Sequence, residues 1–141
     1  MYGLSDTQCR KLQRVQNMAA RILSRTSKYN HITPILKDLH WLPIKVRIEF
    51  KINLLTFKAL HHLLPNYVND LLSLYRPKRV LRSQDTMNLE VPRILSSSGE
   101  RSFCWAAPHL WNKLPMAIRS IQNLTGFKRA LKTHLYTQYF H

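Results

Sequence analysis

Residues 43–62 read PIKVRIEFKINLLTFKALHH, and this stretch decides the fold. On a helix of about 3.6 residues per turn, its apolar residues fall on two sides. One side carries Ile44, Ile48, Ile52 and Leu55, and the other carries Val46, Phe50 and Phe57. A helix that is apolar on two sides must be covered on both, so we predict a central, mostly buried helix from Pro43 to about His62.

A narrow basic ridge, formed by Arg47, Lys51 and Lys58, separates those two sides. Such a ridge could contact phosphates. However, long cationic side chains on a central helix more often lay their stems along the core and hold only the charge in water. We therefore favour a packing role for these three residues.

An N-terminal helix is predicted from Ser5 to about Arg25. The residues SDTQ at 5–8 have capping-box spacing, and Asp6 adds favourable charge near the amino end. The apolar residues of this helix cluster on one side, namely Leu12, Val15, Ala19, Ile22 and Leu23. Four arginines lie on another side, within about 60° of one another and in a row roughly 22 Å long. They are Arg10, Arg14, Arg21 and Arg25.

The remaining elements follow from the prolines and the turn-forming residues. We expect short helices over 34–39 and 66–75, helical pieces over 100–111 and 115–120, and a last helix over 124–139. Residues 76–99 are expected to form a basic loop that holds at most one hairpin, with a short strand at 87–91.

The predicted fold class is mostly α, a single compact helical domain of about five to seven helices over residues 1–141. Its parts are a basic amphipathic N-terminal helix (1–30), central helices (31–75), the basic loop (76–99) and C-terminal helices (100–141). A chain of 141 residues that is 45% hydrophobic and holds three glycines has the composition of one folded domain.

The charge balance points to a polyanionic partner. The chain has 22 Lys and Arg against 7 Asp and Glu, a net charge of +15. A surplus of this size weakens the compact state by self-repulsion and attracts nucleic acid. The residues expected to bind RNA or DNA are the arginine row, Arg10, Arg14, Arg21 and Arg25, and the basic loop residues Arg76, Lys78, Arg79 and Arg82.

The residue types that enzymes use are scattered. The seven acids form no D-x-D, H-E-x-x-H or paired-carboxylate pattern, and no glycine-rich phosphate loop is present. The pairs His61 with His62 and His31 with His40 lack the spacing of a helical metal site, so we expect packing, capping or surface roles for them. We therefore expect no catalytic residue, no metal and no cofactor.

Three tryptophans, Trp41, Trp105 and Trp111, offer possible stacking surfaces for bases. Each is flanked by Leu, Ala or Pro, and we favour core packing over stacking. Cys9 and Cys104 lie far apart and belong to no C-x-x-C pair, which fits a reducing, intracellular compartment. No segment is long and apolar enough to predict a membrane span.

Several runs along the chain carry a family resemblance. They are LQRVQN (12–17), AAR (19–21), HITP (31–34), HWLP (40–43), RIEFKI (47–52), LRS (81–83), VP (91–92), GERSF (99–103), AAPHLWNKLP (106–115) and FKRALKTHL (127–135). Taken in order they resemble the region that follows the polymerase domain in vertebrate LINE retrotransposons of the chicken-repeat and jockey-like groups. The resemblance extends from about residue 2 to the end of the chain.

The resemblance implies a non-catalytic tail of a reverse transcriptase polyprotein. The parent polyprotein would be an RNA-directed DNA polymerase with an endonuclease, and the motifs of neither active site occur in this chain. Such a tail would hold template RNA or target DNA near the polymerase during target-primed reverse transcription. In the family a polymerase precedes this region, whereas this sequence begins at Met1. An incomplete gene model and a separately expressed remnant both stay open.

Three functional hypotheses remain at this point. The first is sequence-tolerant binding of RNA or DNA, which would imply a nuclear location. The second is a helical interaction module that packs on the polymerase domain and exposes an apolar patch when alone. The third is an inert retroelement remnant.

Overall fold

The central helix predicted from residues 43–62 is α3 (Ile44–Leu60) in the computed structural model, which describes residues 3–76, 87–94, 96 and 99–140. Its sequence explains its place, because Leu54 and Phe57 are buried within the main core while Val46 and Phe50 pack against that core. The expectation that both apolar sides are covered is wrong. On the other side Leu55 is 42% exposed, and the three isoleucines line an open hollow beside α1. Over the described residues the chain is a mostly helical compact domain with seven α-helices and no strand, which confirms the predicted fold class.

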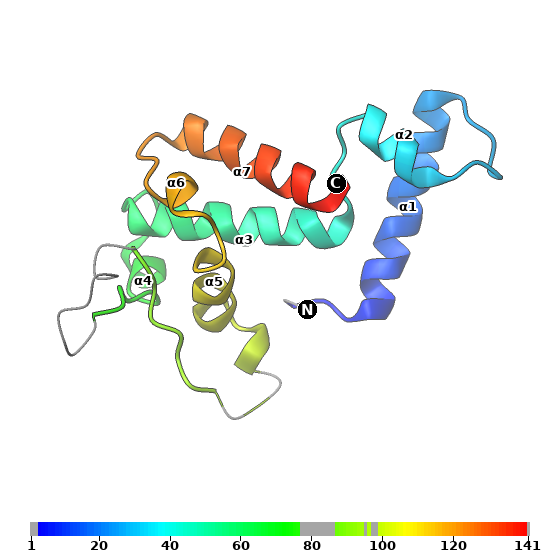
Figure 1. Ribbon diagram of the computed structural model, residues 1–141. Coiled ribbons are helices and arrows are strands. Elements are labelled where there is room, and N and C mark those ends of the chain that lie inside the picture. Colours follow the sequence, from blue (N-terminus) through cyan, green and yellow to red (C-terminus); the bar gives the residue numbers. More distant parts are fainter. Residues whose placement is uncertain (1–2, 77–86, 95, 97–98, 141) are drawn as a thin grey trace.

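The main core lies between α3, α5 (Phe103–Trp111) and α7 (Leu124–Phe140). In Figure 1, α7 runs back along α3, while α5 lies on the other side of α3. Phe57 of α3 stacks on Phe127 of α7 with 4.3 Å between ring centroids, and Trp111 of α5 lies 5.7 Å from Phe127. Burying these large rings together with the leucines of the same core stabilises the packing of the three helices.

The segment 87–90 is attached to the core by the end of α5. The Asn112 amide pairs with both backbone groups of Leu89: its Nδ2 donates to the carbonyl at 2.8 Å, and its Oδ1 accepts from the N–H at 2.8 Å. The Trp111 indole donates to the Met87 carbonyl at 3.0 Å. The predicted strand at 87–91 is therefore wrong. An isolated antiparallel bridge joins Leu89 to Leu74, because the Asn112 side chain takes the place of a neighbouring strand.

The helix predicted over 66–75 is shorter in the structure, because the chain around Leu74 pairs with the segment around Leu89. The observed helix α4 (Asn66–Asn69) has four residues and is followed by a turn at 70–71, after which residues 72–76 are not helical. Two backbone bonds hold this non-helical part, from Tyr75 N–H to the Asn88 carbonyl at 2.9 Å and from Glu90 N–H to the Ser73 carbonyl at 2.8 Å. Backbone groups used in this way cannot also form a helix.

The C-terminal elements follow the prediction closely. A 3₁₀ turn, η1 (Gly99–Arg101), precedes α5, and α6 (Met116–Arg119) and α7 occupy the expected positions. Pro115 is the N-cap residue of α6, where a missing N–H costs nothing.

The N-terminal helix α1 (Asp6–Ser24) has the predicted capping box, with the Ser5 hydroxyl accepting from Gln8 N–H and the Gln8 side chain accepting from Ser5 N–H. It packs with α2 (Ile32–Asp38) around a second cluster of Ala20, Ile35 and Leu36. Phe140, at the far end of α7, packs against the same cluster. The end of α7 thus connects the two parts of the molecule.

Two glutamines of α1 hold the start of α3. The Gln13 side-chain oxygen accepts the Ile44 N–H at 2.9 Å, and Gln16 Nε2 donates to the Leu42 carbonyl at 2.9 Å. Pro43, the N-cap residue of α3, makes no side-chain cap bond. Gln13 therefore caps α3 from a neighbouring helix.

The inward side of α1 is small and polar. Its buried residues are Cys9, Gln16 and Ala20. The large apolar residues predicted to share one side do share it, but that side faces outward. Val15 is 65% exposed, Ile22 is 75% exposed and Leu23 is 62% exposed. The helix therefore has three sectors about 120° apart, one buried, one carrying the arginine row and one apolar and exposed.

Three helices end on non-glycine residues in the left-handed region. After α1, α2 and α3 the residues Arg25, His40 and His62 have φ angles of 51°, 52° and 54°. In each case two backbone bonds close a Schellman motif, as at α3, where Leu63 N–H donates to the Lys58 carbonyl and His62 N–H to the Ala59 carbonyl. Glycine normally takes this position because it has no Cβ to clash. Capping of helix ends is thus the structural role of two histidines.

Replacing Arg25 by glycine should raise the free energy of unfolding by about 1 kcal/mol, since a left-handed non-glycine residue costs roughly that much. Urea denaturation measures the change. Arg25→Ala is the matched control, because it removes the same charge but keeps the Cβ and its strain. An equal gain in both variants would attribute the effect to relief of charge repulsion and contradict this account.

Candidate nucleic-acid interface

The arginine row of α1 lies on the surface. Arg10, Arg14 and Arg25 are exposed, and none of them takes part in either apolar cluster. Arg10 and Arg14 lie on α1 itself, whereas Arg25 is its C-cap residue. Because α1 contacts α2 and α3 through a different sector, one rigid helix sets the spacing of Arg10, Arg14 and Arg21, whereas Arg25 follows the end of that helix. A strand laid along the helical part of the row, from Arg10 to Arg21, would meet cations over roughly 16 Å.

Arg21 differs from the other three members of the row. Its side chain is half-buried, and Nη2 donates to the Asn30 carbonyl at 3.2 Å, which braces the turn between α1 and α2. One donor of the Arg21 guanidinium, Nη2, is therefore already used within the protein. The row that remains available to a ligand is Arg10, Arg14 and Arg25.

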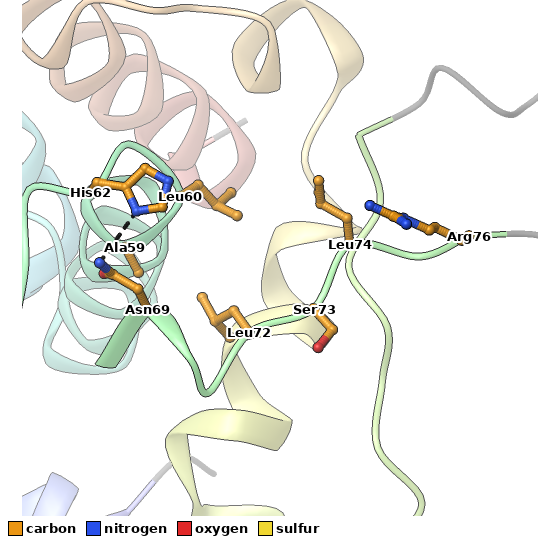
Figure 2. Close-up of a pocket in the computed structure, with 8 residues that line it drawn as sticks. All are labelled: Ala59, Leu60, His62, Asn69, Leu72, Ser73, Leu74 and Arg76. Atoms are coloured by element: carbon orange, nitrogen blue, oxygen red, sulfur yellow. Dashed lines mark hydrogen bonds between the residues drawn. The ribbon is translucent and has the colours of Figure 1, made fainter. Parts of the chain in front are cut away.

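Of the second predicted cluster, Arg76 lies within the described residues, whereas Lys78, Arg79 and Arg82 lie outside them. Arg76 is exposed and lines a hollow of about 470 Å³ between the end of α3, α4 and the segment 72–76. Figure 2 shows His62 and Asn69 on one side of this hollow, and Leu74 and Arg76 on the other.

The polar groups of this hollow were not predicted from the sequence. Asn69 Nδ2 donates to the Leu64 carbonyl at 3.2 Å and lies 3.4 Å from His62 Nδ1, as drawn in Figure 2. Asn69 Oδ1 is buried and has no hydrogen-bond partner among the described residues. Pro65 indicates only the start of a helix, and no local pattern shows that His62 and Asn69 meet.

The basic ridge of α3 is divided between two environments. Lys58 is half-buried, as expected for a side chain that packs along the core, whereas Arg47 and Lys51 are exposed. Arg47 Nε donates to the Leu42 carbonyl at 2.9 Å, and its guanidinium carbon lies 5.7 Å from the centroid of the Trp41 ring. This is a cation–π pair whose cation is also fixed by a hydrogen bond.

The three tryptophans have different environments. Trp111 is 1% exposed and belongs to the main core, in agreement with the predicted packing role. Trp105 is half-buried and stacks on His109 with 4.7 Å between centroids. Trp41 is half-buried at the edge of the second cluster. Trp41 and Trp105 therefore retain surface that a base could reach.

The candidate histidine pairs do not assemble into a metal site. Within the described part of the chain, no three His, Cys, Asp or Glu side chains are grouped closely enough to hold a metal ion. His40 stacks on Tyr136 with 5.5 Å between centroids, and its ring nitrogen lies 3.1 Å from the Asp38 carbonyl.

Three ionisable groups are shifted by burial. Burial raises the pKa of Glu49, an effect that Lys113 partly offsets. Burial also lowers the pKa of His109, with a further lowering from Lys113 and an opposing effect from Glu100. Arg119 has a lowered pKa because it is buried, and its Nη1 donates to Asn88 Oδ1.

No family model, curated protein or solved structure matches this chain. Among the helices of the described residues, none combines the length and the apolar character that crossing a membrane requires.

Glu49→Gln should stabilise the protein at neutral pH relative to the wild type. Because burial raises the folded-state pKa, the protonated carboxyl fits the fold better than the carboxylate. The stability that Glu49 contributes is thus present below its ordinary pKa of 4.5 and is lost as pH rises through the folded-state value.

The measurement compares urea unfolding of both proteins at neutral pH and well below the ordinary pKa. The gain of Glu49→Gln should disappear in acid. Glu90→Gln is the control, because Glu90 is exposed and its loss changes the net charge equally. A pH-independent difference between the two variants would be inconsistent with a buried carboxylate.

Proposed function

We propose that this chain binds RNA or DNA in a sequence-tolerant way, as the non-catalytic tail of a retroelement reverse transcriptase. The observation that carries the proposal is the exposed set of Arg10, Arg14 and the C-cap residue Arg25, on the side of α1 that lies away from both apolar clusters. An arginine on a solvated helix face gives up little hydration free energy when it contacts a phosphate, because a guanidinium is weakly hydrated. The release of the phosphate's counterions favours binding.

The net charge supports the same proposal. With a net charge of +15, the positive side chains of this domain repel one another. A polyanion that binds them would relieve that repulsion. The resemblance to the region after a LINE polymerase supplies the context, since that enzyme handles template RNA and target DNA together. The proposed role is to hold one of these strands near the polymerase.

The test is fluorescence anisotropy with single-stranded RNA, single-stranded DNA and duplex DNA over a series of salt concentrations. Arg10→Gln with Arg14→Gln should weaken binding of all three. It should also make the slope of log affinity against log salt shallower by about 2, roughly one for each lost phosphate contact. Arg21 and Arg25 are left intact because one braces a turn and the other ends a helix.

The matched control is Arg93→Gln with Arg101→Gln, which removes two exposed arginines away from α1. It changes the net charge equally but should leave the salt slope nearer the wild-type value. Equal effects of the two double variants would mean that overall charge, rather than the α1 row, determines binding.

A second candidate function is favoured by the apolar sector of α1. We propose that this sector docks on the polymerase domain of the parent polyprotein. Four large apolar side chains of α1, namely Val15, Met18, Ile22 and Leu23, are more than 60% exposed. Leu12 continues this sector into a hollow of about 320 Å³, which it lines together with Leu4, Ile44, Ile48 and Ile52. Contiguous apolar surface of this kind is typical of protein interfaces.

Charge argues for a different protein rather than a second copy as the occupant. Arg47 and Lys51 border the apolar hollow, and the arginine row lies on the adjacent sector of α1. Two copies docked by this face would bring like charges together, whereas a partner with an acidic rim would pair with them.

Val15→Gln with Ile22→Gln should abolish binding to a separately expressed polymerase domain of a chicken-repeat element, measured by calorimetry. Because both positions are exposed, unfolding free energy should change by less than about 0.5 kcal/mol for each. Leu63→Gln with Tyr67→Gln, at exposed sites elsewhere, should bind like the wild type. Light scattering that shows a dimer which the first variant dissociates would instead assign the face to self-association.

A further inference from the structure

We propose that a hollow between the Trp41 turn, α3 and α7 binds one unpaired nucleotide of a strand, with the phosphate on its cations and the base against its aromatic side chains. This inference rests on the proposed nucleic-acid function and assigns it a specific site. The hollow measures about 380 Å³ and is lined by His40, Trp41, Leu42, Arg47, Phe50, Lys51 and Lys132.

The lining combines the two kinds of side chain that single-strand binders use. Trp41 and Phe50 supply aromatic surface, and both are half-buried, so each has an apolar body anchored in the protein and an accessible remainder. Arg47, Lys51 and Lys132 supply positive charge, and all three are exposed. Stacking gives base dependence, while the cations hold the backbone of any sequence.

The lining residues include no carboxylate, so a phosphate entering the hollow would meet three cations and no opposing anion. Arg47 is held in place beforehand, because its Nε bonds to the Leu42 carbonyl and its guanidinium lies over the Trp41 ring. A guanidinium positioned in this way loses less entropy on binding than a mobile one.

Long-range contacts bring Lys132 to this place. Its helix, α7, is fixed at this end by the Tyr136 hydroxyl, which donates to the Lys37 carbonyl at 2.8 Å, and by stacking of Tyr136 on His40. The backbone of Trp41 is fixed as part of the Schellman motif after α2, because its backbone N–H donates to the Leu36 carbonyl at 2.9 Å. The walls of the hollow are thus set by the fold before a ligand arrives.

An unpaired nucleotide fits this lining better than duplex backbone or an isolated anion. A duplex keeps its bases stacked on one another and would leave Trp41 and Phe50 without a partner. A simple anion would use the cations alone. The volume of about 380 Å³ lies within the range of small-ligand sites, roughly 300–1,000 Å³.

The experiment uses the full chain and three probes: a short oligothymidylate, an abasic strand with the same number of phosphates, and a duplex. Oligothymidylate should quench tryptophan fluorescence and bind about ten-fold more tightly than the abasic strand, as expected for one stacked base. The quench should be absent in Trp41→Phe, which leaves Trp105 and Trp111 as the remaining indoles.

Lys51→Gln with Lys132→Gln should weaken oligothymidylate binding and shift the quench to higher concentration. Both residues are exposed, so the fold should be retained. The control Lys28→Gln with Lys37→Gln removes two exposed lysines that do not line the hollow, and it should keep the full quench.

The outcomes separate this site from the function on which it rests. Equal affinity for abasic strand and oligothymidylate, or a quench that persists in Trp41→Phe, overturns the nucleotide site. If Arg10→Gln with Arg14→Gln still weakens binding in that case, nucleic-acid binding stands without the site. If no probe binds to the wild type at low salt, both proposals fail together.

Discussion

The arrangement of this domain depends on the point where the Leu42 carbonyl and the Ile44 N–H are held by side chains of α1. Leu42 accepts from both Gln16 and Arg47, and Ile44 donates to Gln13. The Gln13 bond satisfies an N–H that the start of α3 leaves open and that Pro43 cannot cap with its side chain. The two glutamine bonds join α1 to the start of α3, and the Arg47 bond fixes the guanidinium that lies over Trp41. The exposed faces of α1 follow from this polar attachment.

That attachment leaves an unusual surface. A helix normally buries its apolar sector, since each buried aliphatic side chain stabilises the fold by roughly 1.5–3 kcal/mol. In α1, Ala20 and two glutamines face inward, while Val15 and Ile22 face outward. The domain therefore forgoes stabilising burial on the same helix that carries the most regular row of arginines. The two exposed sectors, one apolar and one cationic, are the surfaces that the proposed binding of a protein and of a nucleic-acid strand would use.

Local patterns predicted the helices well, and long-range contacts account for what they missed. The Ser5 capping box, the prolines before α3 and α6 and the two-sided apolar pattern of α3 act within a few residues, so they are readable from the sequence. The strand expected at 87–91 fails because Asn112, more than twenty residues away, satisfies the Leu89 backbone. The sequence also did not indicate that the Ile22 side chain would face solvent. Periodicity shows that apolar residues share a side but not which side a neighbouring helix covers.

For the candidate sites too, local patterns predicted one part, and long-range contacts determine the other. The arginine row of α1 was predictable because helical spacing alone aligns Arg10 and Arg14, and the structure adds that Arg21 is partly engaged by Asn30. The hollow beside Trp41 was not predictable, since Lys132 reaches it only because Tyr136 docks on the end of α2 and Phe140 packs against the cluster between α1 and α2. Arg47 and Lys51 border both this hollow and the apolar one beside Leu12. A strand in the first and a protein in the second would therefore draw on the same two cations. By linkage, each ligand that neutralises them weakens the electrostatic part of the other's binding by an equal amount.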